Sequence, residues 1–227
     1  MRKLVLDEIN WFVQPRRRYV ILGHRGSGKT TLLNIIDGSR FPTKGWVERK
    51  GSISPGRGII RAGANTLTPR QIASRLARLY HQSAGEIIAF IEPFAEIAKV
   101  MDYPVGSLPN AIRLRLSYAL TFAIPFDLYL FDGGIGPRQD DFSVRCRHAF
   151  DLRCRDAGAI VVTSSPKIAG QFDGAGMVLH DGKLRLFGSI AEAIAVFNTL
   201  PRPKTTPGLV PERNDFSDDD EGELDFV

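Results

Sequence analysis

The sequence predicts an α/β fold, because short apolar runs alternate along the chain with amphipathic stretches that carry recognisable helix starts. A glycine-rich loop between the first apolar run and the first helix supports this class, and so does a tight-turn dipeptide, Asp181-Gly182, between two late apolar runs. The 227 residues are 43% hydrophobic, enough for one substantial core, and the length fits one domain better than two.

The first half of the chain predicts strands, a helix and a helical middle. Tyr19 to Leu22 is expected to be a buried strand and Lys29 to Ile36 the helix after the glycine-rich loop, with short strands at Gly45 to Arg49 and Gly58 to Arg61. Helix starts near residues 69 and 84 follow from capping-box spacing, in which a hydroxyl and a side chain three residues later satisfy helix-start amides. The hydroxyls belong to Thr68 and Ser83, and their partners are Gln71 and Glu86.

The second half continues the alternation and ends in a hairpin and a helix. The predicted helices are Ala111 to Ile124 and Phe142 to Arg155, the predicted buried strands are Leu128 to Phe131 and Ala159 to Thr163, and the hairpin strands are Met177 to His180 and Leu184 to Phe187. A last helix is expected to open at Ser189.

Charge is divided unevenly along the chain. The segment Pro201 to Val227 holds eight acidic and three basic residues, so residues 1–200 carry 27 basic and 17 acidic residues, a net charge of +10. A basic body can meet phosphates, anionic lipid or nucleic acid, or present a solvated surface. No arginine-rich helix or aromatic-interleaved patch singles out nucleic acid, which is not expected as a partner. Residues 201–227 are expected to be a disordered acidic tail.

Several classes of protein do not fit this composition. No apolar run reaches the 18 or so residues of a membrane span, and the start Met1-Arg2-Lys3 is not followed by an unbroken apolar stretch of the signal-peptide type. Cys146 and Cys154 fall in one predicted helix and do not suggest a disulfide framework or a zinc site. We expect a soluble protein of the reducing cytoplasm.

The strongest chemical signal is the loop between the first strand and the first helix. It matches the Walker A pattern of Gly, four residues and Gly-Lys-Thr. Its backbone amides and the positive helix end are expected to converge on phosphates, with Lys29 reaching the phosphates and Thr30 binding magnesium. The predicted nucleotide-binding residues are Gly23, His24, Arg25, Gly26, Ser27, Gly28, Lys29, Thr30 and Thr31.

A second element resembles a Walker B strand. Asp127 to Asp132 is an apolar run that ends in a carboxylate, and Asp132 is expected to hold Mg²⁺ through water beside Thr30. An aspartate after a strand is a weak signal alone, because it is more often a turn residue. A Walker A loop about a hundred residues upstream strengthens it.

With both elements in place, the chain resembles the nucleotide-binding subunits of ABC transporters, particularly the branch that exports capsular and other surface polysaccharides. The resemblance runs from about Val5 to Asn198. It includes Asp37-Gly38 with residues 41–47, Ser52 to Pro55, residues 67–68 before 77–80, Phe126-Asp127, and the Asp-Gly hairpin with residues 191–194.

The resemblance implies the architecture and the partners. It implies a P-loop NTPase domain over residues 1–200, with a RecA-like core and a helical subdomain at about 68–124. Two such subunits, identical or different, pair head to tail around ATP and Mg²⁺ and drive a transmembrane permease, at the cytoplasmic face of the membrane.

Several of the family's functional residues are missing at the matching positions. The glutamate that polarises the attacking water is replaced by Gly133, and the histidine that contacts the γ-phosphate is replaced by Ser164, which cannot carry imidazolium charge. The Leu-Ser-Gly-Gly-Gln signature corresponds to residues 108–112. There, Pro109 removes an amide donor and Ala111 adds a Cβ where close approach is needed.

Two further family positions are open. The glutamine that couples to the membrane subunit corresponds to Ala64 in strict register, although Asn65 stands one residue away. The aromatic residue that stacks on adenine lies in a strand that would precede Met1. Either the true start lies upstream or the nucleotide is held mainly by its phosphates.

The remaining candidate functional residues can also be explained by structural roles. Arg25 and His24 either touch phosphate or a partner, or face solvent as variable loop positions usually do. Asp140 and Asp141 are better explained as helix-start residues than as replacement bases. Packing or surface roles are assigned to Trp11, Trp46, His81 and His148, and no Ser-His-Asp or metal-ligand set appears.

Three functions remain from the sequence. The first is a hydrolytic ABC subunit that powers export, which Gly133 and Ser164 oppose. The second, which we favour, is a degenerate subunit that binds ATP with little or no turnover of its own. The third is a P-loop kinase or unrelated NTPase, against which the spacing after the Walker loop and the terminal hairpin argue.

Overall fold

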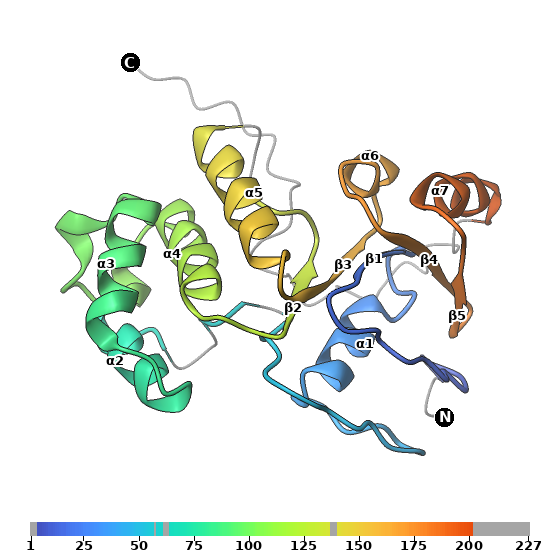
Figure 1. Ribbon diagram of the computed structural model, residues 1–227, viewed down its shortest axis with the longest axis horizontal. Helices are drawn as coiled ribbons and strands as arrows, with labels where there is room; N and C mark the ends of the chain where they lie inside the picture. Colours follow the sequence, from blue (N-terminus) through green and yellow to red (C-terminus); the bar gives the residue numbers. More distant parts are fainter. Residues whose placement is uncertain (1–3, 57, 61–63, 137–139, 202–227) are drawn as a thin grey trace.

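The structure is a computed structural model that describes residues 4–56, 58–60, 64–136 and 140–201 (Figure 1). A sheet with helices on both faces forms one side of the molecule, and a group of helices forms the other. Within the described ranges, no helix combines the length and the apolar character needed to cross a bilayer. Apart from Pro201, the predicted acidic tail lies outside the described residues.

The sheet has five strands in the order β2-β3-β1-β4-β5, of which the first four are parallel and β5 is antiparallel to β4. The strands are β1 Arg18–Leu22, β2 Leu128–Asp132, β3 Gly158–Thr163, β4 Ala175–His180 and β5 Lys183–Leu186. β3 is buried along its whole length, as expected for a parallel strand with both faces covered. The predicted strands at these places and the Asp-Gly hairpin are confirmed.

Helices cover the two faces because successive side chains of a strand point in opposite directions. In β1, Tyr19 and Ile21 pack in one cluster with residues of α1 (Lys29–Ile36), while Val20 and Leu22 pack with α6 (Pro166–Ala169) and α7 (Ile190–Thr199). On β2, Phe131 meets α5 (Asp141–Arg153) through Phe150, with ring centroids 5.7 Å apart. The α/β prediction is therefore confirmed as a layered, parallel-dominated sheet.

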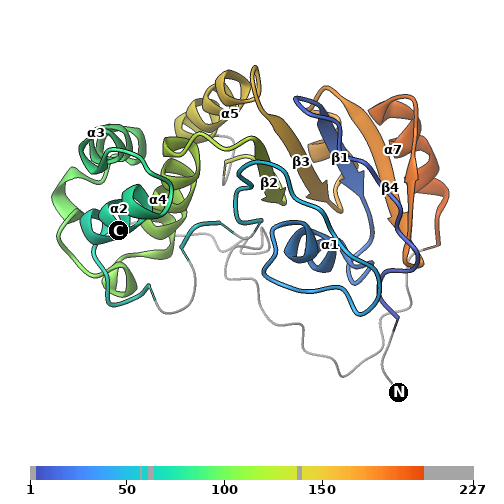
Figure 2. The same cartoon turned by 60° about the horizontal axis from the view of Figure 1, so that its bottom comes forward.

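The helical middle consists of α2 (Pro69–Leu79), α3 (Ala84–Ala95) and α4 (Asn110–Ala123), with short 3₁₀ helices at Ala98–Val100 and Val105–Ser107. The three α-helices stand together beside the β2 edge of the sheet (Figures 1 and 2). The capping box of α2 is complete, and the Ser83 side chain accepts a hydrogen bond from the Glu86 amide at the start of α3. Both predicted helix starts are confirmed.

One ion-pair cluster ties this helical group to the helix that covers β2. The carboxylate of Glu96, at the end of α3, binds Arg115 of α4 and Arg145 of α5, the latter at 2.7 Å. Both guanidinium groups lie over the ring of Phe142, 5.1 and 5.6 Å from its centroid. Hydrogen bonds from Arg115 and Arg145, with the charge of the two arginines, hold the pKa of Glu96 below its usual value.

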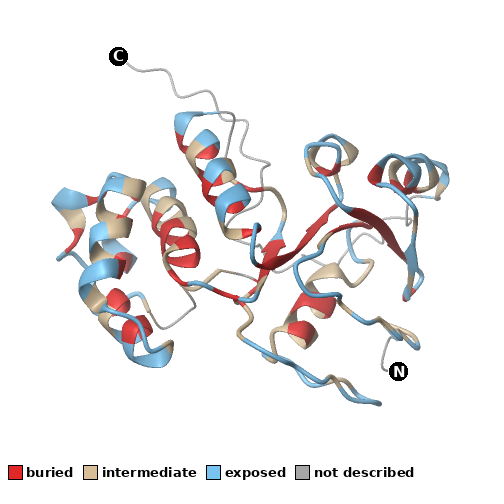
Figure 3. Cartoon of the chain, viewed as in Figure 1, coloured by how far each residue is buried: buried red, intermediate tan, exposed pale blue. Residues whose placement is uncertain are grey.

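Two predicted strands are wrong. Residues 45–49 contain no strand, and neither do residues 58–60, while Arg61 lies outside the described residues. A strand is stable only where a neighbour completes its hydrogen bonds, and residues 44–46 are exposed in a loop that projects from the body (Figure 3). Nearby, Ile53 instead makes a single parallel bridge to Leu128.

Both cysteine thiols are buried, and burial raises the pKa of Cys146 and of Cys154 to about 12. The thiolate is the reactive form. At pH 8, iodoacetamide should therefore label the native protein much more slowly than the urea-unfolded chain, as read by mass spectrometry. Equal labelling rates for the native and unfolded protein would contradict the burial of the two thiols.

The same shift predicts a pH dependence of stability. Well below pH 9 the thiols are protonated in both states, and as pH rises through 9 the unfolded chain releases protons that the folded chain retains. The free energy of unfolding should therefore fall as pH rises from about 9 toward 12, and it should fall less in a Cys146→Ala, Cys154→Ala protein.

Candidate functional site

The phosphate-binding loop connects the end of β1 to the start of α1, as predicted. Gly28 is the N-cap of α1 with φ of +103°, a left-handed conformation that side chains rarely adopt, and no side chain caps the helix. A Cβ at Gly28 would also lie 3.0 Å from side-chain atoms of Val5 and Leu6. The first amides of α1 thus lack a side-chain cap, which suits an anion at the positive helix end.

Lys29 lies inside the loop rather than extending into solvent. Its Nζ donates hydrogen bonds to the carbonyl oxygens of Gly23 at 2.7 Å and His24 at 3.0 Å. Burial lowers the pKa of Lys29, an effect that Asp132 opposes and Arg25 reinforces. A phosphate beside this partly buried ammonium would favour its charged form, so the residue fits the phosphate-binding role predicted for it.

The two predicted magnesium residues meet across the sheet. The Thr30 hydroxyl donates a hydrogen bond of 2.6 Å to Asp132 Oδ2, although 102 positions separate them in the sequence. Both are hard oxygen ligands of the kind Mg²⁺ prefers, and they lie directly beside the loop that would hold the phosphates. The pair fits a magnesium ion bound by one or two protein oxygens together with phosphate and water.

The other loop side chains differ in their surroundings. The His24 ring packs on Phe197 of α7 with centroids 4.5 Å apart, so this side chain is engaged away from the helix start. Ser27 Oγ is buried without a hydrogen-bond partner among the described residues, which leaves a donor for a ligand in the loop. Arg25 and Gly26 are exposed and Thr31 is half-buried. Nucleotide contact by these residues remains a prediction.

Gly133 and Ser164 stand where the resemblance places the missing glutamate and histidine, and the structure puts both beside the loop. The Gly133 amide donates to the Val162 carbonyl at 2.8 Å, and Ser164 follows the last residue of β3 directly. Gly133 has φ of +113°, so the backbone here is shaped for glycine. Neither residue supplies a carboxylate or an imidazole.

The signature-equivalent segment begins α4. Pro109 is the N-cap and accepts a hydrogen bond from the Arg113 amide at 3.0 Å, but no side chain caps the helix. Pro109, Asn110 and Ala111 are exposed. A helix start without glycine or serine, and with one amide removed by proline, presents fewer donors to a partner than the family's signature does.

The structure does not decide whether Ala64 or Asn65 takes the place of the family's coupling glutamine. Ala64 packs against the main core cluster, whereas Asn65 is exposed and its carbonyl accepts the Gly106 amide at 2.8 Å.

Asp140 Oδ1 accepts the Ser143 amide at 2.8 Å, which is the capping role predicted for it at the start of α5.

Two residues that contact the site, Tyr118 and Phe197, were not predicted from the sequence. The Tyr118 hydroxyl donates to the Gly134 carbonyl at 3.0 Å and so ties α4 to the turn after Asp132. Phe197 supports the His24 ring from the last helix. No local pattern signals either contact, because each joins residues that are distant in the sequence.

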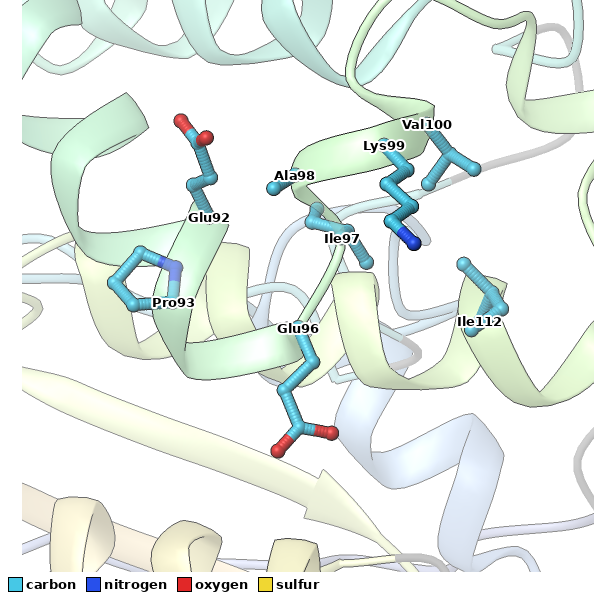
Figure 4. Close-up of a pocket in the computed structure, with 8 residues that line it drawn as sticks. All are labelled: Glu92, Pro93, Glu96, Ile97, Ala98, Lys99, Val100 and Ile112. Atoms are coloured by element: carbon cyan, nitrogen blue, oxygen red, sulfur yellow. The ribbon is translucent and has the colours of Figure 1, made fainter.

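A surface hollow of about 640 Å³ lies away from this site, between the end of α3 and the start of α4 (Figure 4). Its apolar lining includes Ile97, Val100 and Ile112, with Glu92 and Lys99 contributing charge. None of the predicted nucleotide-binding residues lines it. We therefore place the chemistry at the loop after β1 and not in this hollow.

Comparison with known proteins agrees with the geometry. Residues 6–74 match the family model described as ABC transporter. The chain is 30% identical over 199 residues to the capsule polysaccharide export ATP-binding protein CtrD of Neisseria meningitidis serogroup B, covering 88% of this chain and 92% of that protein. It is 29% identical to the ATP-binding protein BexA of Haemophilus influenzae, covering 86% and 90%.

A solved ATP-binding subunit of an ABC transporter has the same fold. It superimposes with a TM-score of 0.66 over 86% of this chain and 93% of that one, at 16% sequence identity. At that identity the likeness concerns the fold alone.

Replacing Lys29 tests the loop directly. Lys29→Ala removes a charged donor worth about 1.5–3 kcal/mol, so affinity for ATP with Mg²⁺ should fall about 10- to 150-fold in calorimetric titration. The matched control is Lys99→Ala, which removes an exposed lysine of the helical group and should bind as the parent does. Unchanged affinity in Lys29→Ala would show that phosphates bind elsewhere.

Proposed function

The chain belongs to the ATP-binding subunits of ABC transporters, and we propose that it serves polysaccharide export as a subunit that binds ATP with little or no hydrolysis of its own. The observation that carries the proposal is the combination of a complete phosphate loop with Gly133 in a left-handed conformation where the family has its glutamate. The groups that would bind the phosphates are present, and the glutamate that would act as the general base is missing.

The export branch is supported by the relatives. Proteins named for capsule polysaccharide export and polysialic acid transport match 86–88% of this chain at 28–30% identity. Proteins named for teichoic acid export match with 26–27% identity. Export of polymers by these relatives would place this subunit beside a permease that moves a polymer across the membrane.

Nucleotide binding follows from the residues of the loop. The α1 amides and Lys29 would neutralise the phosphates, the Ser27 hydroxyl would gain a partner, and Thr30 and Asp132 would hold Mg²⁺. When bound, Mg²⁺ offsets the negative charge of the phosphates.

Hydrolysis would need three further contributions that this chain lacks. Gly133 cannot orient water, Ser164 cannot supply an imidazolium, and the start of α4 lacks the glycines and the serine that reach a partner's γ-phosphate. Positioning of water and stabilisation of the transferred phosphoryl group are most of the catalysis in this reaction class. We therefore assign a binding and conformational role to this subunit.

A hydrolytic subunit remains the second candidate, because Lys29, Thr30 and Asp132 offer the phosphate- and Mg²⁺-binding groups that hydrolysis would also need. An unrelated P-loop kinase is not carried forward, since the relatives cover nearly the whole chain. The partners we propose are a transmembrane permease and a second ATP-binding subunit, identical or different. The proposed location is the cytoplasmic face of the cell membrane, as a peripheral protein.

Steady-state phosphate release tests the proposal. With ATP and Mg²⁺ the purified protein should bind nucleotide but release phosphate at the background rate, also after reconstitution with its permease in vesicles. A Lys29→Ala protein sets that background. Robust release above it by this chain alone would establish the hydrolytic alternative.

Restoring the glutamate tests why turnover is absent. Gly133→Glu should recover little activity, because a side chain at φ of +113° strains the backbone by about 1–3 kcal/mol and the α4 start remains altered. The control is Gly133→Ala, which adds the same backbone strain without a carboxylate. Turnover in Gly133→Glu near that of active family members would show that a single side chain accounts for the loss.

A further inference from the structure

The loop that follows α1 carries a surface that the nucleotide site does not use. Residues 38–50 leave the end of α1, extend away from the body and return toward Ser52 (Figures 1 and 2). Most of the loop is exposed (Figure 3). We call residues 38–50 the projecting loop.

The base of the projecting loop is held firmly on both sides. Asp37 accepts the Ser39 amide at 2.8 Å with one carboxylate oxygen and the Gly56 amide at 3.0 Å with the other. Arg49 donates to the carbonyl oxygen of Ile36 at 2.8 Å and also binds that of Ile35, so it satisfies the free carbonyls at the end of α1. The tip is thus presented on a fixed base.

The tip places two aromatic rings in solvent. The exposed fractions of Phe41 and Trp46 are 85% and 88%, the two highest among the large hydrophobic side chains of the described residues. Single exposed apolar residues are ordinary, but two fully exposed aromatic side chains in one short loop mark an interaction surface. Their burial against a partner would be favourable, and the body of the protein does not provide it.

The charge around these rings is basic. The projecting loop contains Arg40, Lys44, Arg49 and Lys50 against one acidic residue, Glu48. Glu48 pairs with Lys50 at 3.2 Å. Both side chains are largely exposed, so this ion pair contributes little to stability. Lys44 and Arg40 flank the aromatic residues and are exposed.

We infer that the projecting loop binds the surface of an anionic lipid bilayer directly, with Phe41 and Trp46 inserted at the headgroup level. The ammonium groups of Lys44 and Lys50 and the guanidinium of Arg40 then lie on the lipid phosphates. Tryptophan favours the membrane interface because its ring is apolar and its N–H is polar. Lysine and arginine gain about 1 kcal/mol each near an anionic membrane surface, which is about fivefold in partitioning. The inference does not depend on nucleotide binding or turnover.

Trp46 provides its own optical probe. The chain has two tryptophans, and Trp11 packs edge-on against Tyr19 with centroids 5.0 Å apart. In a full-length Trp11→Phe protein, which keeps a ring at that place, tryptophan emission reports Trp46 alone. Vesicles of phosphatidylcholine with phosphatidylglycerol should shift this emission to shorter wavelength, and brominated acyl chains should quench it. Pure phosphatidylcholine vesicles should do neither.

Co-sedimentation with the same vesicles separates the two parts of the surface. Phe41→Ser with Trp46→Ser should weaken partitioning at least tenfold at any salt concentration. Lys44→Gln with Lys50→Gln should weaken it about 25-fold at low salt and less at high salt. The matched controls are Tyr103→Ser, which removes an exposed aromatic residue outside the loop, and Lys99→Gln.

Retained affinity for ATP with Mg²⁺ shows that each variant is folded. Trp46 emission that stays unshifted with anionic vesicles overturns the inference, as does a Tyr103→Ser effect equal to that of the loop variant. Shielding of Trp46 only in vesicles that contain the permease also overturns it and assigns the loop to a protein partner. Failure of ATP binding in the parent would contradict the proposed function and leave the lipid result unaffected.

Discussion

The nucleotide site depends on one constraint, the parallel alignment of β2, β3 and β1. Because these three strands run in the same direction as neighbours, their carboxyl ends lie at one edge of the sheet. That edge brings the phosphate loop after Leu22, Ser164 after β3 and Asp132 at the end of β2 together, and it makes the Thr30–Asp132 hydrogen bond possible. The edge is built by buried apolar strands that carry no chemistry themselves.

Elements that depend on a few adjacent residues could be predicted from the sequence. Elements that depend on contacts between residues distant in the sequence could not. The Walker loop, the strand and the helix that flank it, and the capping box at Thr68 each depend on a few adjacent residues, and all were predicted. The prediction of a strand at Gly45 to Arg49 was wrong because a strand needs a neighbouring strand to pair with, and the local sequence does not show whether one is present. The Tyr118–Gly134 bond and the His24–Phe197 contact could not be foreseen for the same reason.

Binding and hydrolysis are separable in this architecture because they use different groups. Phosphates are held by backbone amides and one lysine, and these survive so long as the loop and α1 fold. Hydrolysis needs side chains at strand ends, where single substitutions remove function without disturbing the sheet. Gly133 adds a backbone requirement, since its φ of +113° lies in the left-handed region that side chains rarely adopt. A carboxylate placed at this position would therefore have to meet a conformational requirement as well as a chemical one.

Helix α1 joins the nucleotide site to the projecting loop. Its eight residues span about 12 Å, with the positive end at the phosphate loop and the negative end bound by the Arg49 guanidinium. The positive N-terminal end of α1 is therefore complementary to the phosphates that the loop would bind. The negative C-terminal end is complementary to the basic projecting loop. Continuous backbone hydrogen bonds connect these two ends. Nucleotide binding and contact with the membrane surface would then act on opposite ends of the same element.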